Sequence, residues 1–137
     1  MANFYGTART NYFKVKSPEK FKEYVDTIPG AILISKKEDR ATLYGYYMDN
    51  EYGTFPSSGR YADDDEEYDI DVVDDIVAYL AEGSVAVFMD CGAEKCRYLT
   101  GCAIAIDSKG ESVMINLSDI YKMAEQQLGI LPTRAEY

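Results

Sequence analysis

Two long runs of apolar residues, joined by a short polar link, limit what this chain can fold into more than any other feature. The first run is SVAVFMDC at 84–91, and the second is CRYLTGCAIAI at 96–106. Each run has the length of a strand, and their β-branched and aromatic residues favour strand structure. The intervening GAEK is only long enough for a hairpin loop. The sequence therefore predicts an antiparallel strand pair here.

Other segments predict further strands and three helices. The helices start at residues typical of helix N-termini, Ser17-Pro18 and Ser118-Asp119, or end at a glycine, Gly83 or Gly129. We expect strands at 10–16, 31–35, 41–48 and 112–117, and helices at 18–28, 70–82 and 119–128.

Helical spacing predicts which side chains of the second and third helices face inward. In helix 70–82 the expected buried stripe is Ile70, Val73, Val77 and Leu80. In helix 119–128 it is Ile120, Met123, Ala124 and Leu128.

The element order is therefore β-α-β-β-α-β-β-β-α, which is typical of an α+β fold. We expect a largely antiparallel sheet of about five to six strands with two to three helices packed on it. The 137 residues suit a single domain spanning 1–137. Residues 49–69 lack an apolar period and are expected to form an irregular acidic loop.

Charge is distributed unevenly along the chain. The net charge is −10, and no Lys or Arg lies between Arg60 and Lys95, where twelve acids fall. An acidic surface repels nucleic acid phosphates and anionic membranes, and it attracts basic proteins. The expected partner is a basic nucleic-acid-binding protein or complex of the host, with no direct contact to nucleic acid or membrane.

The acidic segment from 61 to 75 is the candidate binding site. In the expected helix 70–82, Asp71, Asp74, Asp75 and Glu82 would project from one face as a rigid set of carboxylates. A solvated helix face following a flexible loop is the alternative interpretation, and the sequence leaves both open. The candidate partner-binding residues are Tyr61, Asp63, Asp64, Asp65, Glu66, Glu67, Tyr68, Asp69, Asp71, Asp74 and Asp75.

The sequence contains no pattern typical of catalysis or metal binding. Histidine is absent, and no nucleophile elbow, phosphate-binding loop or zinc-protease motif occurs. The acidic segment lacks the glycine that an EF-hand loop needs. Cys91, Cys96 and Cys102 lack zinc-site spacing, and we expect them to be buried core thiols. The prediction is a non-enzymatic protein with no cofactor and no metal site.

The chain is expected to be cytoplasmic. Its apolar runs are too short to span a bilayer, and the first residues lack a signal-peptide core. An odd number of cysteines also fits a reducing compartment.

Two segments, FYGTARTNYFKVK near the start and GAEKCRYLTGCAIAI in the second half, carry a family resemblance. The chain resembles small acidic proteins encoded on bacterial plasmids, phages and integrated elements. The resemblance implies an anti-defence role, such as an antirestriction or anti-CRISPR inhibitor that imitates DNA or blocks a basic groove. It implies no particular functional residues.

Three functional hypotheses follow, and the third is a histidine-free enzyme, which a deep pocket lined by converging Asp, Tyr and Arg side chains would favour. In the first, the protein is a mobile-element inhibitor whose acidic surface occupies the nucleic-acid-binding surface of a host defence complex. In the second, it is an accessory or structural mobile-element protein that acts through a Tyr-rich surface or as a homodimer, and the acids only keep it soluble. The salt dependence of partner binding distinguishes the first two hypotheses, because a charge-driven complex weakens as the salt concentration rises.

Overall fold

The structure, a computed structural model, describes residues 4–50, 53–56, 58–60, 67–94 and 97–135. In this part of the chain no helix is long and apolar enough to cross a membrane. The elements in chain order are β1 (Phe4–Thr10), α1 (Pro18–Asp26), β2 (Ala31–Glu38), β3 (Ala41–Met48), β4 (Ser58–Arg60), β5 (Glu67–Asp69), α2 (Val72–Ile76), β6 (Val85–Glu94), β7 (Tyr98–Asp107), β8 (Ser112–Asn116) and α3 (Asp119–Leu128).

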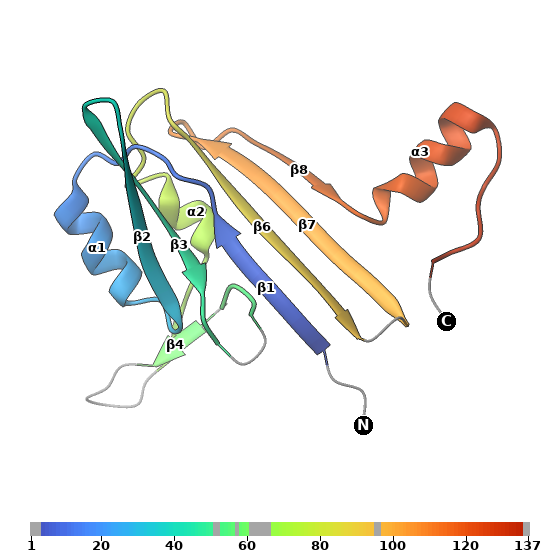
Figure 1. The fold of residues 1–137 in the computed structure, drawn as a ribbon, viewed down its shortest axis with the longest axis horizontal. Coiled ribbons are helices and arrows are strands. Elements are labelled where there is room, and N and C mark those ends of the chain that lie inside the picture. The colour runs from blue at the N-terminus through green and yellow to red at the C-terminus, as the bar shows by residue number, and fades with distance from the viewer. Residues whose placement is uncertain (1–3, 51–52, 57, 61–66, 95–96, 136–137) are drawn as a thin grey trace.

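Six of the strands form one antiparallel sheet in the order β2-β3-β1-β6-β7-β8. The predicted pair at its centre is present, with β6 and β7 in register from Val85 opposite Asp107 to Glu94 opposite Tyr98. The hairpin of β2 and β3 is also confirmed. The α+β class and the expected order are therefore confirmed, with two short strands added between β3 and α2 (Figure 1).

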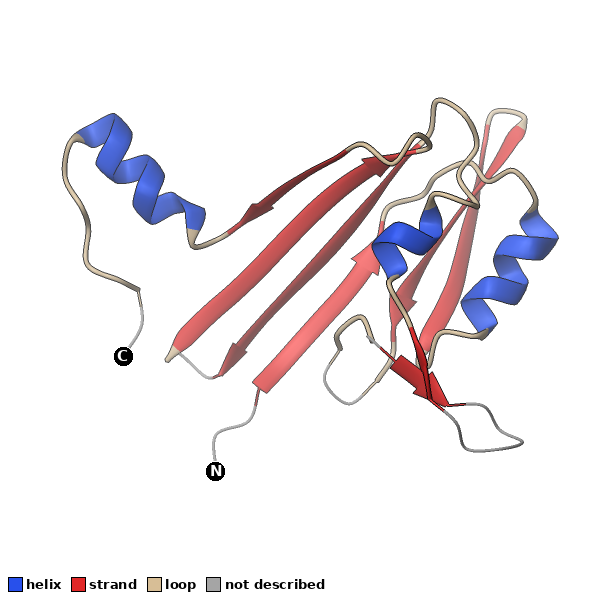
Figure 2. Ribbon diagram, turned by 180° about the vertical axis from the view of Figure 1, so that it is seen from behind, coloured by secondary structure: helices blue, strands red, loops and turns tan. Residues whose placement is uncertain are grey.

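Helices α1 and α2 cover one face of the sheet on the side of β1, β2 and β3 (Figure 2). Helix α1 begins as predicted, because the Ser17 side chain accepts a hydrogen bond from the Lys20 N–H and Pro18 occupies the first turn. Phe21 of α1 is fully buried and anchors the core. Its ring centroid lies 5.5–6.5 Å from those of Phe13, Tyr44, Tyr46 and Tyr79.

The first strand lies earlier than predicted: β1 occupies 4–10 and not 10–16. Asn11 ends its pairing with β6, since the Asn11 side chain accepts from the Val87 N–H at 2.8 Å and takes the place of a strand partner. Beyond it the chain makes only isolated bridges, from Phe13 to Tyr44 and from Val15 to a residue after α2.

The predicted helix 70–82 is wrong in length, because α2 has five residues. Beyond it the backbone turns away to pair with the segment after β1. The Tyr79 carbonyl accepts from the Lys16 N–H, and the Ala81 N–H donates to the Lys14 carbonyl. The N–H groups of residues 77–80 still donate to carbonyls three or four residues earlier, and the long-range hydrogen bonds take over at Tyr79 and Ala81.

The expected irregular loop at 49–69 contains regular structure. Strands β4 and β5 form a two-stranded antiparallel ribbon with Ser58 opposite Asp69 and Arg60 opposite Glu67. The ribbon lies below the α1 and α2 side of the sheet in Figure 2 and leads directly into α2.

Helix α3 is present at the predicted residues and ends at Gly129 in a left-handed conformation, with φ of 74°. It projects beyond β8 and away from both faces of the sheet (Figures 1 and 2). The prediction that Ile120, Met123 and Leu128 face inward is therefore wrong for the single chain, since they are 58, 46 and 75 % exposed. Ala124 of the same predicted stripe is only half-buried.

Candidate functional site

The structure describes the second half of the predicted acidic site. Five of the predicted residues lie outside the described part of the chain: Tyr61, Asp63, Asp64, Asp65 and Glu66. Glu67 and Tyr68 belong to β5. Asp69, Asp71 and Asp74 are exposed, and Asp75 is half-buried. The described acids thus lie where the β4–β5 ribbon joins α2.

Two of these acids hold the fold together. An Asp71 carboxylate oxygen accepts from the Asp74 N–H at 3.1 Å and caps α2. Asp75 accepts from the Tyr24 hydroxyl at 3.2 Å, which ties α2 to α1. Burial, followed by the nearby Tyr46 and Asp75, raises the pKa of Tyr24 well above its usual range. Tyr24 therefore remains a neutral donor to Asp75.

The expected row of carboxylates along helix 70–82 does not form. Helix α2 is too short to carry it, Asp75 points to Tyr24, and Glu82 lies beyond the helix before Gly83. What remains available to a partner among the described acids is Asp69 and Asp74, with Asp71 partly used by its cap. The structure thus supports an acidic surface, without the regular helical spacing that the sequence predicted.

A second candidate surface, which the sequence reasoning missed, is the sheet face opposite α1 and α2. In an antiparallel sheet, residues directly opposite each other share a face, and successive residues alternate between faces. Register places Arg9, Met89, Ala103 and Ile115 in one row across β1, β6, β7 and β8. No helix covers this side of the described chain, and Figure 1 looks onto it. We call it the open face.

The open face is apolar over β1, β6, β7 and β8. Large side chains in its rows are strongly exposed: Tyr5 69 %, Met89 54 %, Leu99 63 %, Val113 68 %, Ile115 64 % and Leu117 56 %. The opposite rows behave differently, since Thr10 and Phe88 there are 2 and 3 % exposed under the helices. Over β1 and β6, the difference in burial between the two faces identifies the open face as the one without a cover.

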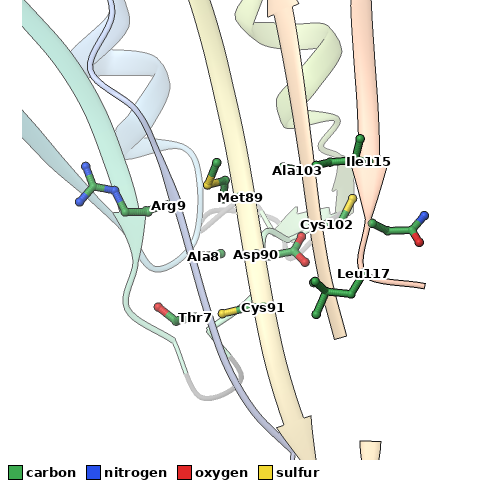
Figure 3. A pocket seen from close by; sticks show the side chains of 12 residues that line it. Thr7, Ala8, Arg9, Met89, Asp90, Cys91, Cys102, Ala103, Ile115 and Leu117 are labelled. Atoms are coloured by element: carbon green, nitrogen blue, oxygen red, sulfur yellow. The ribbon is translucent and has the colours of Figure 1, made fainter. Parts of the chain in front are cut away.

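A groove runs along the open face over β7. Small residues, Gly101 and Ala103, form its floor, and the larger Met89 and Ile115 flank it on β6 and β8 (Figure 3). Leu117 overhangs the floor, since a Cβ placed on Gly101 would lie 3.0 Å from its side chain. This hollow has a volume of about 370 Å³. A neighbouring hollow of about 500 Å³ shares Thr7, Cys91 and Leu117 with it, so the groove extends toward Tyr5 and Leu99.

Asp90 and Cys102 are two of the titratable groups that line the groove. Burial raises the pKa of Asp90, and burial followed by the charges of Asp90 and Asp119 raises the pKa of the Cys102 thiol. A raised pKa keeps Cys102 in the thiol form, which is a poor nucleophile.

The cysteines only partly match the prediction of buried core thiols. Cys102 is half-buried, but Cys91 is exposed on the open face, opposite Gly101, so that prediction is wrong for Cys91. Cys96 lies outside the described residues.

The sequence contains a pattern that indicates an apolar open face. In 85–89 of β6, both alternating sets of residues are apolar: Val85, Val87 and Met89 on one face, and Ala86 and Phe88 on the other. Strands apolar on both faces are typical of sheets covered on both sides. The structure covers one side, and the pattern indicates that the other also needs a cover.

A scan of protein-family models, a search of curated proteins and a search of solved structures each found no match to this chain.

Proposed function

We propose that the protein is a non-enzymatic binding protein whose acidic segment, 61–75, occupies the basic nucleic-acid-binding surface of a host defence complex. This is the antirestriction or anti-CRISPR kind of inhibition, and it needs no cofactor. The observation that supports it is charge segregation: nine acids fall between Asp63 and Asp75, with no Lys or Arg from 61 to 94. Asp69 and Asp74 are exposed at the described end of this segment.

The structure determines which acids can be reversed in a test. Asp71 caps α2 and Asp75 binds Tyr24, so reversing either would disturb the fold. The test variant therefore changes four other acids to Lys: Asp63, Asp65, Asp69 and Asp74. The control variant changes four exposed acids outside the segment to Lys: Glu23, Asp26, Glu111 and Glu125. Both variants alter net charge equally.

Pull-downs from a host lysate at low and high salt, read by mass spectrometry, compare the two variants with the unsubstituted chain. We expect a basic nucleic-acid-binding complex to be retained at low salt, lost at high salt, and lost with the test variant only. If both variants lose the complex equally, net charge alone explains the binding. If both variants retain the complex, the acidic segment is not the binding site.

The second candidate is an accessory or structural protein that acts through a Tyr-rich surface or a homodimer. The open face favours it, because Tyr5 and Tyr47 are exposed there by 69 and 41 % beside other apolar side chains. Aromatic residues of this kind are enriched at protein interfaces. A complex through this face would survive high salt and both sets of charge reversals.

A further inference from the structure

The chain exposes more surface than a folded monomer of its size. A monomeric protein of 15.4 kDa exposes about 7,200 Å² on average, whereas this chain exposes 9640 Å². The difference is about 2,400 Å². A standard interface buries about 800 Å² per partner, and obligate homodimers bury about 1,000–2,500 Å² per partner. The exposed surface is thus large enough to supply an interface of this size.

The exposed large hydrophobic side chains are concentrated in one region. Twelve of the fifteen large hydrophobic side chains that are exposed in the described residues lie from Val85 onward, on β6, β7, β8, α3 and the tail that follows. Of these, Val85, Met89, Leu99, Val113, Ile115 and Leu117 lie on the open face, and exposed apolar patches of this kind mark interaction sites.

The open face is also nearly free of acids, in a chain of net charge −10. On its described rows over β1, β6, β7 and β8 the one acid is Asp107. Asp107 lies at the far end of β7 and accepts from the Lys109 and Glu111 N–H groups. A second, equally acidic copy can therefore approach this face without bringing carboxylates together.

Helix α3 is amphipathic but packs on neither face of the sheet. Its direction is fixed at the joint after β8, where an Asp119 carboxylate oxygen accepts from the Asn116 N–H at 2.8 Å. The following tail closes on it, because the Ala135 N–H donates to the Tyr121 hydroxyl at 2.7 Å. Yet none of the residues of α3 is buried, and a ten-residue helix is marginal on its own in water. Its apolar stripe has no packing partner among the described residues.

We propose that the protein is a homodimer in which the two open faces pack together and each α3 lies in the groove of the other copy. Each chain carries both an uncovered apolar face and an unpacked amphipathic helix, which is what a two-fold interface with exchanged arms requires. The two-residue joint, Leu117-Ser118, holds α3 out as such an arm. This dimer does not depend on the proposed partner of the acidic segment.

Two neighbouring residues of β8 provide a matched test. Ile115 is 64 % exposed on the open face, and Met114 is 59 % exposed on the opposite face of the same strand. Sedimentation velocity over a range of concentrations is run on the full chain and on each variant, with circular dichroism to confirm folding. We expect the full chain and Met114→Asp to be dimers. Ile115→Asp should raise the dissociation constant by about a hundredfold or more, because it would bury an unpaired charge.

The exchanged helix is tested separately. Met123→Asp places a charge in the apolar stripe of α3, and Lys122→Asp places one at its exposed neighbour. Met123→Asp should weaken the dimer by about tenfold or more, and Lys122→Asp should have little effect. Equal effects of the two would overturn the exchange of α3.

Cys91 reports on the face directly. With Cys96 and Cys102 replaced by serine, the Cys91 thiol should react slowly with a maleimide in the dimer and quickly in the Ile115→Asp background. A full chain that sediments as a monomer at all concentrations overturns the proposal. A monomer overturns the proposal even if α3 proves to fold onto its own sheet, or if native mass spectrometry shows a small molecule bound in the groove. A dimer that Ile115→Asp leaves intact also overturns it.

Salt distinguishes this proposal from the proposed function. The dimer should persist at high salt, because its contacts are apolar and screening reduces the repulsion between two acidic copies. The acidic partner should dissociate under the same conditions. Either proposal can therefore fail while the other stands.

Discussion

The two halves of the sheet are built from similar residues but are buried very differently. Strands β1, β2 and β3 lie under α1 and α2 and contribute Tyr46, Ala8 and Met48 to the core. Strands β7 and β8 with α3 contribute only Ile106 among the described buried residues. Across one row from β1 to β8, exposure rises from 2 % at Thr10 and 3 % at Phe88 to 59 % at Met114. We call these regions the covered half and the open half.

The comparison shows that apolar content does not decide burial. Both halves contain strands with alternating apolar residues, and both have an amphipathic helix nearby. The difference lies in where the helix goes: α1 returns across the sheet after a short turn, whereas α3 continues away from it (Figure 1). An apolar face is buried only where the chain path returns to cover it.

The largest expected effect comes from truncating the anchor of the covered half. Phe21→Ala removes a fully buried ring among four aromatic neighbours and should cost about 3–5 kcal/mol of unfolding free energy. Val113→Ala in the open half, 68 % exposed, should cost under about 0.5 kcal/mol in dilute solution. Urea denaturation of both variants at a concentration where the chain is monomeric measures this, and similar costs would mean that the open half is packed in the single chain.

Alkaline pH should destabilise the covered half. Burial raises the pKa of both Tyr24 and Tyr46, so the folded chain keeps two protons that the unfolded chain releases above about pH 10. Stability is therefore complete below pH 10 and falls as pH rises further, by about 1.4 kcal/mol per pH unit for each group.

Urea titrations between neutral and strongly alkaline pH measure this loss. The double variant Tyr24→Phe, Tyr46→Phe should flatten the curve, and Tyr5→Phe, an exposed tyrosine of the open face, should leave it unchanged. A curve that Tyr5→Phe flattens equally would contradict the assignment to buried tyrosines.

The boundary between the halves should depend on Asn11. Its side chain donates to the Val85 carbonyl at 3.1 Å and accepts from the Val87 N–H at 2.8 Å, where β1 leaves β6. Asn11→Ala leaves both backbone groups unpaired and should cost about 1–3 kcal/mol. Hydrogen exchange checks the location: the Val87 amide should lose protection, whereas amides in the β2–β3 hairpin should keep theirs.

The smallest effect is expected at Tyr46 itself. Its hydroxyl is buried and has no hydrogen-bond partner among the described residues. Tyr46→Phe removes that unpaired group with little change in shape, so at neutral pH it should leave stability unchanged or raise it by up to about 1 kcal/mol. Thermal unfolding measures the change, and a marked loss would show that the hydroxyl is paired in solution.

Local patterns predicted most of the fold. Ser17-Pro18 marked the start of α1, Gly129 marked the end of α3, and alternation with a short link gave the β6–β7 pair. These predictions succeed because helix caps and the alternation of apolar residues in strands depend on only a few neighbouring residues.

The failures came from contacts between distant segments. Residues 77–82 have a helical pattern, yet Lys14 and Lys16 bind the backbone there and end α2 early. Asn11 likewise moved β1 by pairing with a strand more than seventy residues away. The acidic site was predicted as a helix face for the same reason, and the open face depends on the path of the whole chain.

The two outer strands of the sheet differ in a way that limits the size of any assembly. Strand β2 ends in Lys36, Lys37 and Glu38, all exposed, and charged side chains of this kind oppose the addition of a further strand. Strand β8 carries Val113, Met114 and Ile115 in the same position. The charged end of β2 therefore opposes growth by strand pairing at that edge more than the apolar β8 does at the other, which favours closed particles of defined mass over fibres.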